Sequence, residues 1–330
     1  MYKIKQIPED FRVNELFSLT EKITSQILTA ETPFSYFRME KTNFTTMKAI
    51  DMIARKLRMP RKKIGFAGNK DKKAVTKQNI SIRYGKKDLI ENLNIRDIEL
   101  TFLGCSSEPI SLGDLNGNSF KITIRNLTKT QKPQIKEKMI NYFGEQRFSK
   151  NNVKIGKYII KKDFKKAVDL LRKNEREFQV RIYEYMKQNP RDYVGALRLF
   201  QLKILKLYVH SYQSDLWNKM ADKYLEKNKE PKNIKIPLIG FHSRLENPDM
   251  KFIIRNMMKK EEITPRDFII RQIPDLSSAG DYRQLFVSIK DLKISKPQED
   301  DINKDKFKYI IRFSLTKGSY ATEAIKVIFS

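Results

Sequence analysis

Cysteine and histidine are scarce in this sequence, which contains only Cys105, His210 and His242. A single cysteine cannot form an internal disulfide, and its rarity indicates a reducing compartment. A zinc site built from cysteine and histidine needs more ligands than these residues provide, so zinc fingers and zinc-dependent deaminases are excluded. Because no base stands near Cys105 in the sequence, we expect it to be a small buried hydrophobic residue.

Long apolar runs are also missing. No stretch approaches the ~20 apolar residues that span a membrane, and the N-terminus has no apolar signal core. There is no internal repeat and no low-complexity tract. Together with the single cysteine, the lack of a membrane span and of a signal core predicts a cytoplasmic protein.

Acidic residues are too few to balance the basic ones. The 67 lysines and arginines face 39 aspartates and glutamates, which leaves a formal charge of +28 and a pI near 9.9. A general enrichment in lysine would usually bring matching glutamate, and here it does not. Since 40% of the residues are hydrophobic and 11% aromatic, this is a folding sequence rather than a disordered basic tail. The charge predicts a polyanionic partner, nucleic acid first.

Hydrophobic periodicity divides the 330 residues into segments of different character, enough for two domains or for one domain with a large insertion. Helical spacing predicts an amphipathic helix from Asn43 to Met59, and most of the stretch from Lys157 to about Asn228. A starting proline and a closing glycine predict a short helix from Pro133 to Gly144. Alternation of apolar and polar residues predicts strands at residues 78–84, 119–126, 284–290, 308–315 and 324–329. A helical domain inserted into a sheet domain would give this order.

The stretch GFAGNKDKKAVTKQ, residues 65–78, contains two glycines that could cradle phosphate. It lacks the Gly-Lys-Ser/Thr of a Walker A loop and the Gly-x-Gly-x-x-Gly of a dinucleotide site. A KH-type Gly-x-x-Gly loop joins two helices, whereas the residues that follow here are strand-like. The glycines alone therefore predict no more than a tight turn between a helix and a strand.

Asp71 is the only acid in this basic stretch. Six cations surround it in the sequence, namely Arg61, Lys62, Lys63, Lys70, Lys72 and Lys73. A carboxylate among cations is held ionised, which suits nucleophilic attack or charge stabilisation better than proton donation. The alternative is a surface turn whose aspartate makes an ordinary ion pair of little energetic weight.

Aromatic residues leave a similar choice open. Phe120 begins an apolar strand face just after Asn118, where it could stack on a nucleic-acid base or simply belong to the core. Tyr212, Trp217 and Met220 lie at helical spacing in an apolar stripe, and we expect them to be packing residues.

Six stretches, in order along nearly the whole chain, resemble the TruD family of tRNA pseudouridine synthases. They are PEDFRVNE (8–15), GFAGNKDKKAVTKQ (65–78), NSFKITIRN (118–126), NYFGEQRF (141–148), SYQSDLWN (211–218) and KGSYAT (317–322). Any one of them would be only suggestive. Six such matches in the same order along the chain are not expected by chance.

The resemblance implies an α+β fold in which a pseudouridine-synthase catalytic domain, with a mixed or antiparallel sheet, is interrupted by a mainly helical α/β insertion, the TRUD domain. The implied boundaries are residues 1–150 for the N-terminal part of the catalytic domain, 151–277 for the insertion and 278–330 for the C-terminal part. The implied reaction is isomerisation: the uracil of a chosen uridine is detached from its ribose, turned and rejoined through carbon, without cofactor or metal.

The resemblance also implies roles for particular residues. Asp71 is the implied catalytic carboxylate, with Lys5 beside it. Asn118 and Phe120 correspond to an Asn-x-Phe pair, with Phe120 stacking on the target base. Tyr320 stands where the family often has phenylalanine, and Arg283 lies in SSAGDYRQL, a looser version of a glycine-arginine motif. Lys70, Lys72 and Lys73 are expected to contact the RNA backbone, so that tRNA binding would depend strongly on salt.

The expected partner is tRNA, bound by a monomer with no membrane association. The implied target is uridine 13 of the D-arm first and an anticodon uridine second. Asp71 could attack the ribose C1′ or remove the C2′ proton to give a glycal. A non-catalytic RNA-binding protein on the same scaffold is the alternative, although such a protein would not need Lys5, Asp71 and Asn118-x-Phe120 together. A methyltransferase would show a cofactor-binding glycine loop after a strand.

Overall fold

The computed structural model describes residues 2–148, 151–174, 176–243 and 248–330. The chain forms two compact units: unit 1 comprises Met1–Met139 and Ser288–Ser330, and unit 2 comprises Ile140–Val287. A unit made of both chain ends and a unit made of the middle agree with an α+β domain that carries an insertion. The domain boundaries implied by the resemblance stay a prediction, and residue 150 lies outside the described residues.

Unit 1 is built on a mixed sheet with the strand order β11-β13-β6-β1-β4-β2-β5, to which β12 adds beside β13 and β3 beside β4. β1 runs parallel to β4, and the other pairings described in this sheet are antiparallel. The strands are β1 (Phe11–Leu16), β2 (Phe34–Thr42), β3 (Ile64–Phe66), β4 (Val75–Arg83), β5 (Ile98–Ser106), β6 (Gly117–Leu127), β11 (Lys290–Ile294), β12 (Gln298–Glu299) and β13 (Phe307–Thr316). The predicted strands at 78–84, 119–126 and 308–315 are confirmed.

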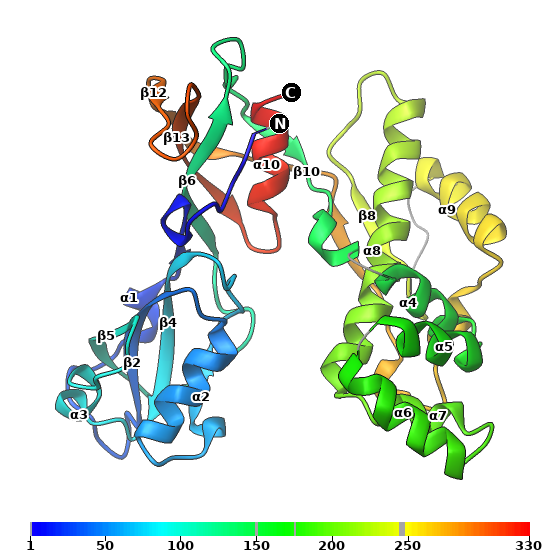
Figure 1. Ribbon diagram of the computed structural model, residues 1–330, viewed down its shortest axis with the longest axis horizontal. Coiled ribbons are helices and arrows are strands. Elements are labelled where there is room, and N and C mark those ends of the chain that lie inside the picture. Colours follow the sequence, from blue (N-terminus) through cyan, green and yellow to red (C-terminus); the bar gives the residue numbers. More distant parts are fainter. Residues whose placement is uncertain (1, 149–150, 175, 244–247) are drawn as a thin grey trace. The chain divides into compact units, whose positions relative to one another are not determined.

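Short helices accompany this sheet, and α2 covers part of it (Figure 1). The helices are α1 (Leu19–Lys22), α2 (Thr46–Lys56), α3 (Lys87–Glu91) and α10 (Ala321–Ile328), with 3-10 helices η1 (Pro8–Asp10) and η2 (Arg61–Lys63). The Thr45 side chain caps α2 by accepting a hydrogen bond from the Lys48 N–H at 3.2 Å. The buried face of α2 packs with residues of β2, β4 and β5 in one core cluster. The predicted helix at 43–59 is confirmed, with tighter bounds.

Two predicted elements are wrong. Residues 133–144 form no helix: Lys138–Ile140 is strand β7, paired with β10 (Phe286–Ser288). Proline and glycine at the two ends favoured a helix, but strand pairing with β10 outweighs those end signals: Met139 is buried within β7, while Ile135 is exposed. Residues 324–328 of the predicted strand at 324–329 are instead part of α10, because Ala321, Ala324, Ile325 and Ile328 form one buried helical face.

Unit 2 is mainly helical, as predicted for the middle of the chain. Its helices are α4 (Asn152–Ile160), α5 (Phe164–Asn174), α6 (Arg176–Gln188), α7 (Tyr193–Arg198), α8 (Leu202–Lys227) and α9 (Pro248–Glu261), with η3 (Glu145–Phe148), η4 (Pro265–Phe268) and η5 (Pro274–Leu276). The 26-residue α8 contacts α4 and α9 (Figure 1). Tyr212, Trp217 and Met220 of α8 are buried, so the expectation that they are packing residues is confirmed.

A two-stranded sheet completes unit 2, in which β8 (Lys235–Leu238) pairs with β9 (Asp281–Gln284). Among the described helices of either unit, none combines the length and the apolar character needed to cross a membrane.

Candidate active site

Asp71 lies in the loop between β3 and β4, where its carboxylate meets a lysine from far along the chain. Lys5 Nζ is 2.6 Å from Asp71 Oδ2, and the Lys5 and Asp71 side chains are 21% and 39% exposed. Lys5 precedes η1 and β1, and the parallel pairing of β1 with β4 brings the two segments together. The carboxylate is therefore reachable from solvent and already paired with one ammonium group.

The backbone around Lys5 is held in an uncommon conformation. Lys5 has a φ of 59°, in the left-handed region, which a non-glycine residue adopts only where its surroundings impose it. The next two backbone N–H groups, of Gln6 and Ile7, both donate to Asp10 Oδ2, at 3.0 and 3.1 Å. Asp10 is thus the residue that fixes the segment carrying Lys5.

Lys41 is a second cation beside Asp71, and it is absent from the residues predicted for the site. Its side chain is fully buried at the end of β2, and Nζ donates to the backbone carbonyls of Phe44 at 2.6 Å and Asp71 at 3.3 Å. Burial lowers the pKa of Lys41 to about 8, although the nearby Asp71 charge acts in the opposite direction. Lys41 ties the Asp71 loop to the sheet through the backbone. Among 67 basic residues, nothing in the sequence marked this one.

The low pKa of Lys41 predicts a pH-dependent stability. Its pKa is about 8 in the fold against 10.5 unfolded, so the folded state binds fewer protons between these values and the cost of burying the ammonium is relieved as pH rises. From pH 8 to 10.5, wild type should gain about 3 kcal/mol in unfolding free energy relative to Lys41→Met. Urea unfolding across this range measures the gain. Lys56→Met, at an exposed position of α2, should track wild type; a Lys41→Met profile parallel to wild type would contradict the prediction.

The loop is also held through Lys70, whose ammonium is committed elsewhere. Lys70 Nζ lies 2.6 Å from Glu15 Oε1, with the two side chains 6% and 0% exposed. The other Glu15 oxygen accepts the backbone N–H of Asn79 at 3.0 Å. This buried pair leaves Lys70 little surface for phosphate. Lys72 and Lys73 are exposed, and within the described part of the chain neither ammonium group makes a hydrogen bond or ion pair.

The two glycines differ in what they do. Gly65 lies within β3, and a Cβ there would come within 2.3 Å of the Ile110 carbonyl oxygen, so the close approach requires glycine. A Cβ on Gly68 would meet ordinary contacts only, 3.8 Å or more away. The predicted tight turn is therefore a short strand at Gly65, which has a packing role.

Phe120 sits in a row of side chains across the middle of the sheet. Val13 of β1 and Phe313 of β13 are its register partners, and the Phe120 and Phe313 rings stack with centroids 5.2 Å apart. Phe11 contacts Phe120 edge-on at 6.2 Å, and Lys5 Nζ lies 4.0 Å from the Phe11 ring centroid. Phe120 is 8% exposed. A continuous set of contacts thus leads from Asp71 through Lys5 to the aromatic row.

Asn118 lies two residues before Phe120 on the same face of β6, opposite Glu15 and Leu315. Its Oδ1 atom is buried and accepts no hydrogen bond from the residues that the structure describes. A buried amide oxygen without a donor is costly, unless a ligand supplies one. The structure thus brings Lys5, Asp71, Asn118 and Phe120 onto one region of unit 1.

Tyr320 and Arg283, the other two predicted residues, belong to different segments of the chain. Tyr320 is the residue preceding α10, in the turn that follows β13, whose last residue Thr316 pairs with Gly117. Arg283 is in unit 2, where it donates to the Asn141 carbonyl at 2.7 Å and to Asn141 Oδ1 at 2.6 Å, and its guanidinium lies 4.1 Å from the Phe143 ring centroid. These contacts give Arg283 a packing role within unit 2.

Cys105 is buried, as expected, and burial raises the pKa of its thiol. Within the described ranges, no group of three or more histidine, cysteine, aspartate or glutamate side chains is arranged to hold a metal ion.

Comparison with known proteins covers almost the entire chain. The family model described as tRNA pseudouridine synthase D (TruD) matches residues 2–179, 171–232 and 226–328. A probable tRNA pseudouridine synthase D of Nanoarchaeum equitans is 32% identical, over 99% of this chain and 98% of the relative. The tRNA pseudouridine synthase D of Aquifex aeolicus is 28% identical with the same coverage. The solved structure of a putative tRNA pseudouridine synthase D from Methanosarcina mazei superposes with a TM-score of 0.73, at 24% identity over 99% of this chain and 93% of that one, which shows a shared fold.

Proposed function

Because the chain belongs to the TruD family of tRNA pseudouridine synthases, we propose that it converts one uridine of a tRNA to pseudouridine with Asp71 as the reacting carboxylate. The observation that carries the assignment of Asp71 is its 2.6 Å contact with Lys5, across 66 residues of sequence. A surface aspartate without a function would not be expected to lie in a loop that buried charged residues hold in place. This one has a loop fastened by Lys41 and by the Lys70–Glu15 pair.

The reaction requires the glycosidic bond of the target uridine to come within reach of Asp71. A base in folded RNA must first be turned out of its stack, which costs a few kcal/mol. The Asp71 carboxylate then either attacks C1′ or takes the C2′ proton, and both routes use it as an anion. The Lys5 ammonium neutralises that anion while leaving Asp71 partly exposed to the incoming ribose.

The base itself is proposed to lie against Asn118 and Phe120. The unpartnered Oδ1 of Asn118 would accept a hydrogen bond from an N–H of uracil or from a ribose hydroxyl. Phe120 would offer the accessible part of its ring to the base. Tyr320, Lys72 and Lys73 are proposed to contact the surrounding RNA, with Lys70 acting mainly through Glu15. We propose uridine 13 as the first target and an anticodon uridine as the second, for a cytoplasmic monomer that needs no metal or cofactor.

The test of this proposal is to map pseudouridine in tRNA incubated with the purified protein, by carbodiimide modification and primer extension, with the Asp71→Asn variant beside it. A single new pseudouridine made only by wild type supports the assignment and identifies the position. If wild type binds tRNA and makes no pseudouridine in any tRNA tested, the protein is the non-catalytic RNA binder instead.

Phe120→Leu separates base stacking from core packing at this position. Leucine keeps most of the volume, so we expect a stability loss of about 1 to 2 kcal/mol together with a kcat reduced about tenfold. The control is Phe313→Leu, in the same aromatic row, which should lose similar stability and keep its kcat within about twofold. Unfolding in urea and single-turnover rates on tRNA give the two quantities. Equal kcat values for both variants and wild type would assign Phe120 to the core alone.

A further inference from the structure

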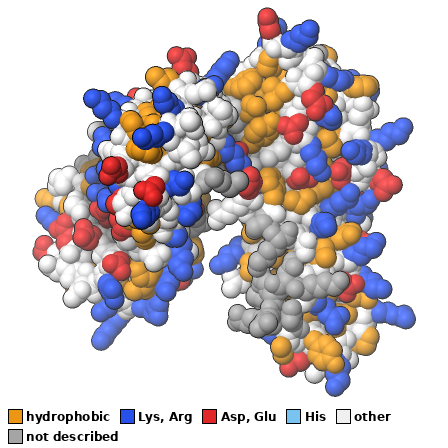
Figure 2. Space-filling model, turned by 45° about the horizontal axis from the view of Figure 1, so that its top comes forward, with side chains coloured by type: hydrophobic (Ala, Val, Ile, Leu, Met, Phe, Trp, Pro, Cys, Tyr) orange, Lys and Arg blue, Asp and Glu red, His pale blue; other side chains and the backbone are white. Residues whose placement is uncertain are grey.

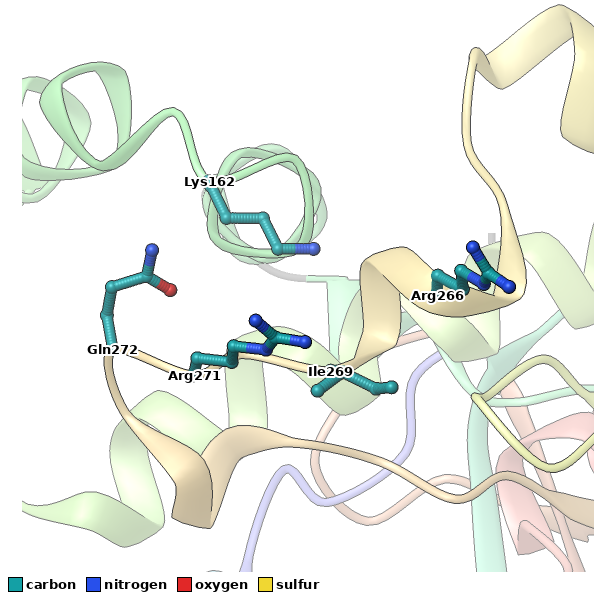
Figure 3. A pocket seen from close by; sticks show the side chains of 5 residues that line it. All are labelled: Lys162, Arg266, Ile269, Arg271 and Gln272. Atoms are coloured by element: carbon teal, nitrogen blue, oxygen red, sulfur yellow. The ribbon is translucent and has the colours of Figure 1, made fainter.

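Unit 2 contains a basic hollow that the proposed reaction does not use. A cavity of about 380 Å³ is lined by Lys162, Arg266, Ile269, Arg271 and Gln272, and none of these residues is acidic (Figure 3). Lys162 follows α4, Arg266 lies in η4, and Arg271 and Gln272 lie between η4 and η5. In Figure 3, the Lys162 and Arg271 side chains extend from opposite walls, with Ile269 between Arg271 and Arg266.

The two arginines of this hollow have no counter-charge. Across the described residues, neither the Arg266 nor the Arg271 guanidinium donates a hydrogen bond or makes an ion pair. Asp267, the acid nearest in sequence, is otherwise engaged: one oxygen accepts the N–H and the hydroxyl of Thr264, at 2.7 and 2.9 Å, and the other lies 3.4 Å from Lys162 Nζ. Two like charges beside one cavity are unfavourable without an anion.

Hydrogen bonds within the protein hold the segments that line the hollow in place without a ligand. Lys162 Nζ donates to the backbone carbonyl of Asp267, which holds the end of α4 against η4. Arg198 of α7 donates to the Gln272 carbonyl at 2.8 Å, which holds the turn that carries Arg271. Lys162, Arg266 and Arg271 therefore line a preformed space. Guanidinium groups favour phosphate, because their planar donors match two oxygens of one phosphate group.

A second hollow shares Lys162 with the first as a lining residue. Its volume is about 280 Å³, and Lys162, Lys165 and Arg191 are among the residues that line it. Its two acids are internally satisfied: Asp163 pairs with Lys166 at 2.7 Å, and Asp192 accepts the Tyr185 hydroxyl at 2.6 Å and the Gly195 N–H at 2.8 Å. Two adjoining basic hollows suit successive phosphates of a chain better than one isolated phosphate.

We propose that these two hollows, centred on Lys162, form a binding site on unit 2 for the phosphodiester backbone of the tRNA substrate. The proposal rests on the proposed function for the identity of the RNA. It assigns to unit 2 a role in holding the substrate while unit 1 carries the reacting carboxylate. Charge alone cannot locate such a site, because lysine and arginine side chains are scattered over the face shown in Figure 2, with fewer acidic ones between them. The proposed site is distinguished by two arginines without an ion-pair partner and by lining segments that hydrogen bonds hold in place.

The test compares two double variants that remove equal charge from unit 2. Arg266→Gln/Arg271→Gln should raise the Kd for tRNA about tenfold and reduce the slope of log K against log salt by about 0.7 to 0.9 for each phosphate that the protein no longer neutralises. Arg172→Gln/Arg255→Gln, at exposed positions of α5 and α9 that line neither hollow, should change Kd less than about twofold. All four positions tolerate glutamine without a core change, and thermal unfolding checks this.

Fluorescence anisotropy with labelled tRNA measures the Kd without requiring turnover, so a failure of catalysis and a failure of this site are separate results. In the pseudouridine assay, the pocket variant should raise KM and leave kcat unchanged. Equal weakening by both double variants, or by neither, would overturn the proposal. Competition by inorganic phosphate or uridine monophosphate at millimolar concentration, seen with wild type and absent in the pocket variant, would assign the hollows to a free phosphate ligand and also overturn it.

Discussion

Asp71→Asn is expected to lower the rate of pseudouridine formation by at least about 10³-fold and to leave the Kd for tRNA within about twofold, since a reacting carboxylate contributes several kcal/mol to the barrier. Asparagine keeps the size of the side chain and a hydrogen-bond acceptor for Lys5 Nζ, now 2.6 Å from Asp71 Oδ2. It removes the anion that either route of the reaction uses. The loss should therefore fall on kcat, while the backbone contact from Lys41 keeps the loop in place.

The matched control is Asp51→Asn in α2, another partly exposed aspartate of unit 1, which lies 3.5 Å from Arg61 Nε. This variant should retain activity within about twofold, because surface ion pairs contribute little. Rates come from primer extension after carbodiimide treatment, and Kd from anisotropy. An Asp71→Asn protein that modifies tRNA at the wild-type rate would remove Asp71 from the active site.

Arg125→Met is expected to destabilise the protein by about 3 to 5 kcal/mol, because it strands buried carboxylates. Arg125 lies on β6 with its side chain 5% exposed, and it donates to Asp10 Oδ1 at 2.7 Å and to Asp300 Oδ1 at 2.8 Å. Both acids are buried, so neither can recover its hydration when the guanidinium is removed. This cluster joins β6 to the segment before β1 and to the segment before β13.

The dependence of stability on acid pH is a second measure of the same cluster. Burial alone would raise the pKa of Asp300, but hydrogen bonds from the Asn126 and Ile302 N–H groups, from Asn303 and from Arg125 outweigh it and lower that pKa to about 2. A carboxyl group with a lowered folded-state pKa stabilises the fold above its unfolded value, and that contribution is lost as pH falls from about 4 to about 2. In Arg125→Met part of this acid dependence should disappear.

Urea unfolding at pH 7 and thermal unfolding from pH 7 to pH 2 measure both effects. Arg312→Met is the control, at an exposed position on the neighbouring strand β13, and it should change stability by less than about 0.5 kcal/mol. Because Asp10 also fixes the backbone beside Lys5, Arg125→Met should lower kcat even where the protein stays folded. A variant as stable and as active as wild type would contradict the role given to this cluster.

Local pattern predicted most of the regular elements near the site and failed where two patterns compete. Strands β4 and β6 and helix α2 have apolar residues at one clear period, and each was predicted. The segment AIKVIF also fits a strand when taken alone, but Ala321 upstream joins Ala324, Ile325 and Ile328 in one buried helical face. The turn residues around 133–144 are compatible with a helix, yet pairing of β7 with β10 decided otherwise.

Some residues of the candidate site were likewise predicted from the sequence, and others were not. Asp71, Lys5, Asn118 and Phe120 were named from motifs that resemble a family, and the sheet places them together. Lys41 was missed, and Lys70 was expected at the RNA although its ammonium is buried against Glu15. In a chain with 67 basic residues, the residues next to a lysine in the sequence do not indicate whether its side chain is buried.

By itself, the sequence determined the excess of positive charge, the scarcity of possible metal ligands, the periods that form helices and strands, and the order of motifs that indicates the family. These depend on residue type and on spacing over a few positions. Only the tertiary structure decided which cations meet Asp71, because Lys5 lies 66 residues away and Lys41 lies 30 residues away. Sheet register sets those contacts, and register is settled by which faces of distant strands are buried together.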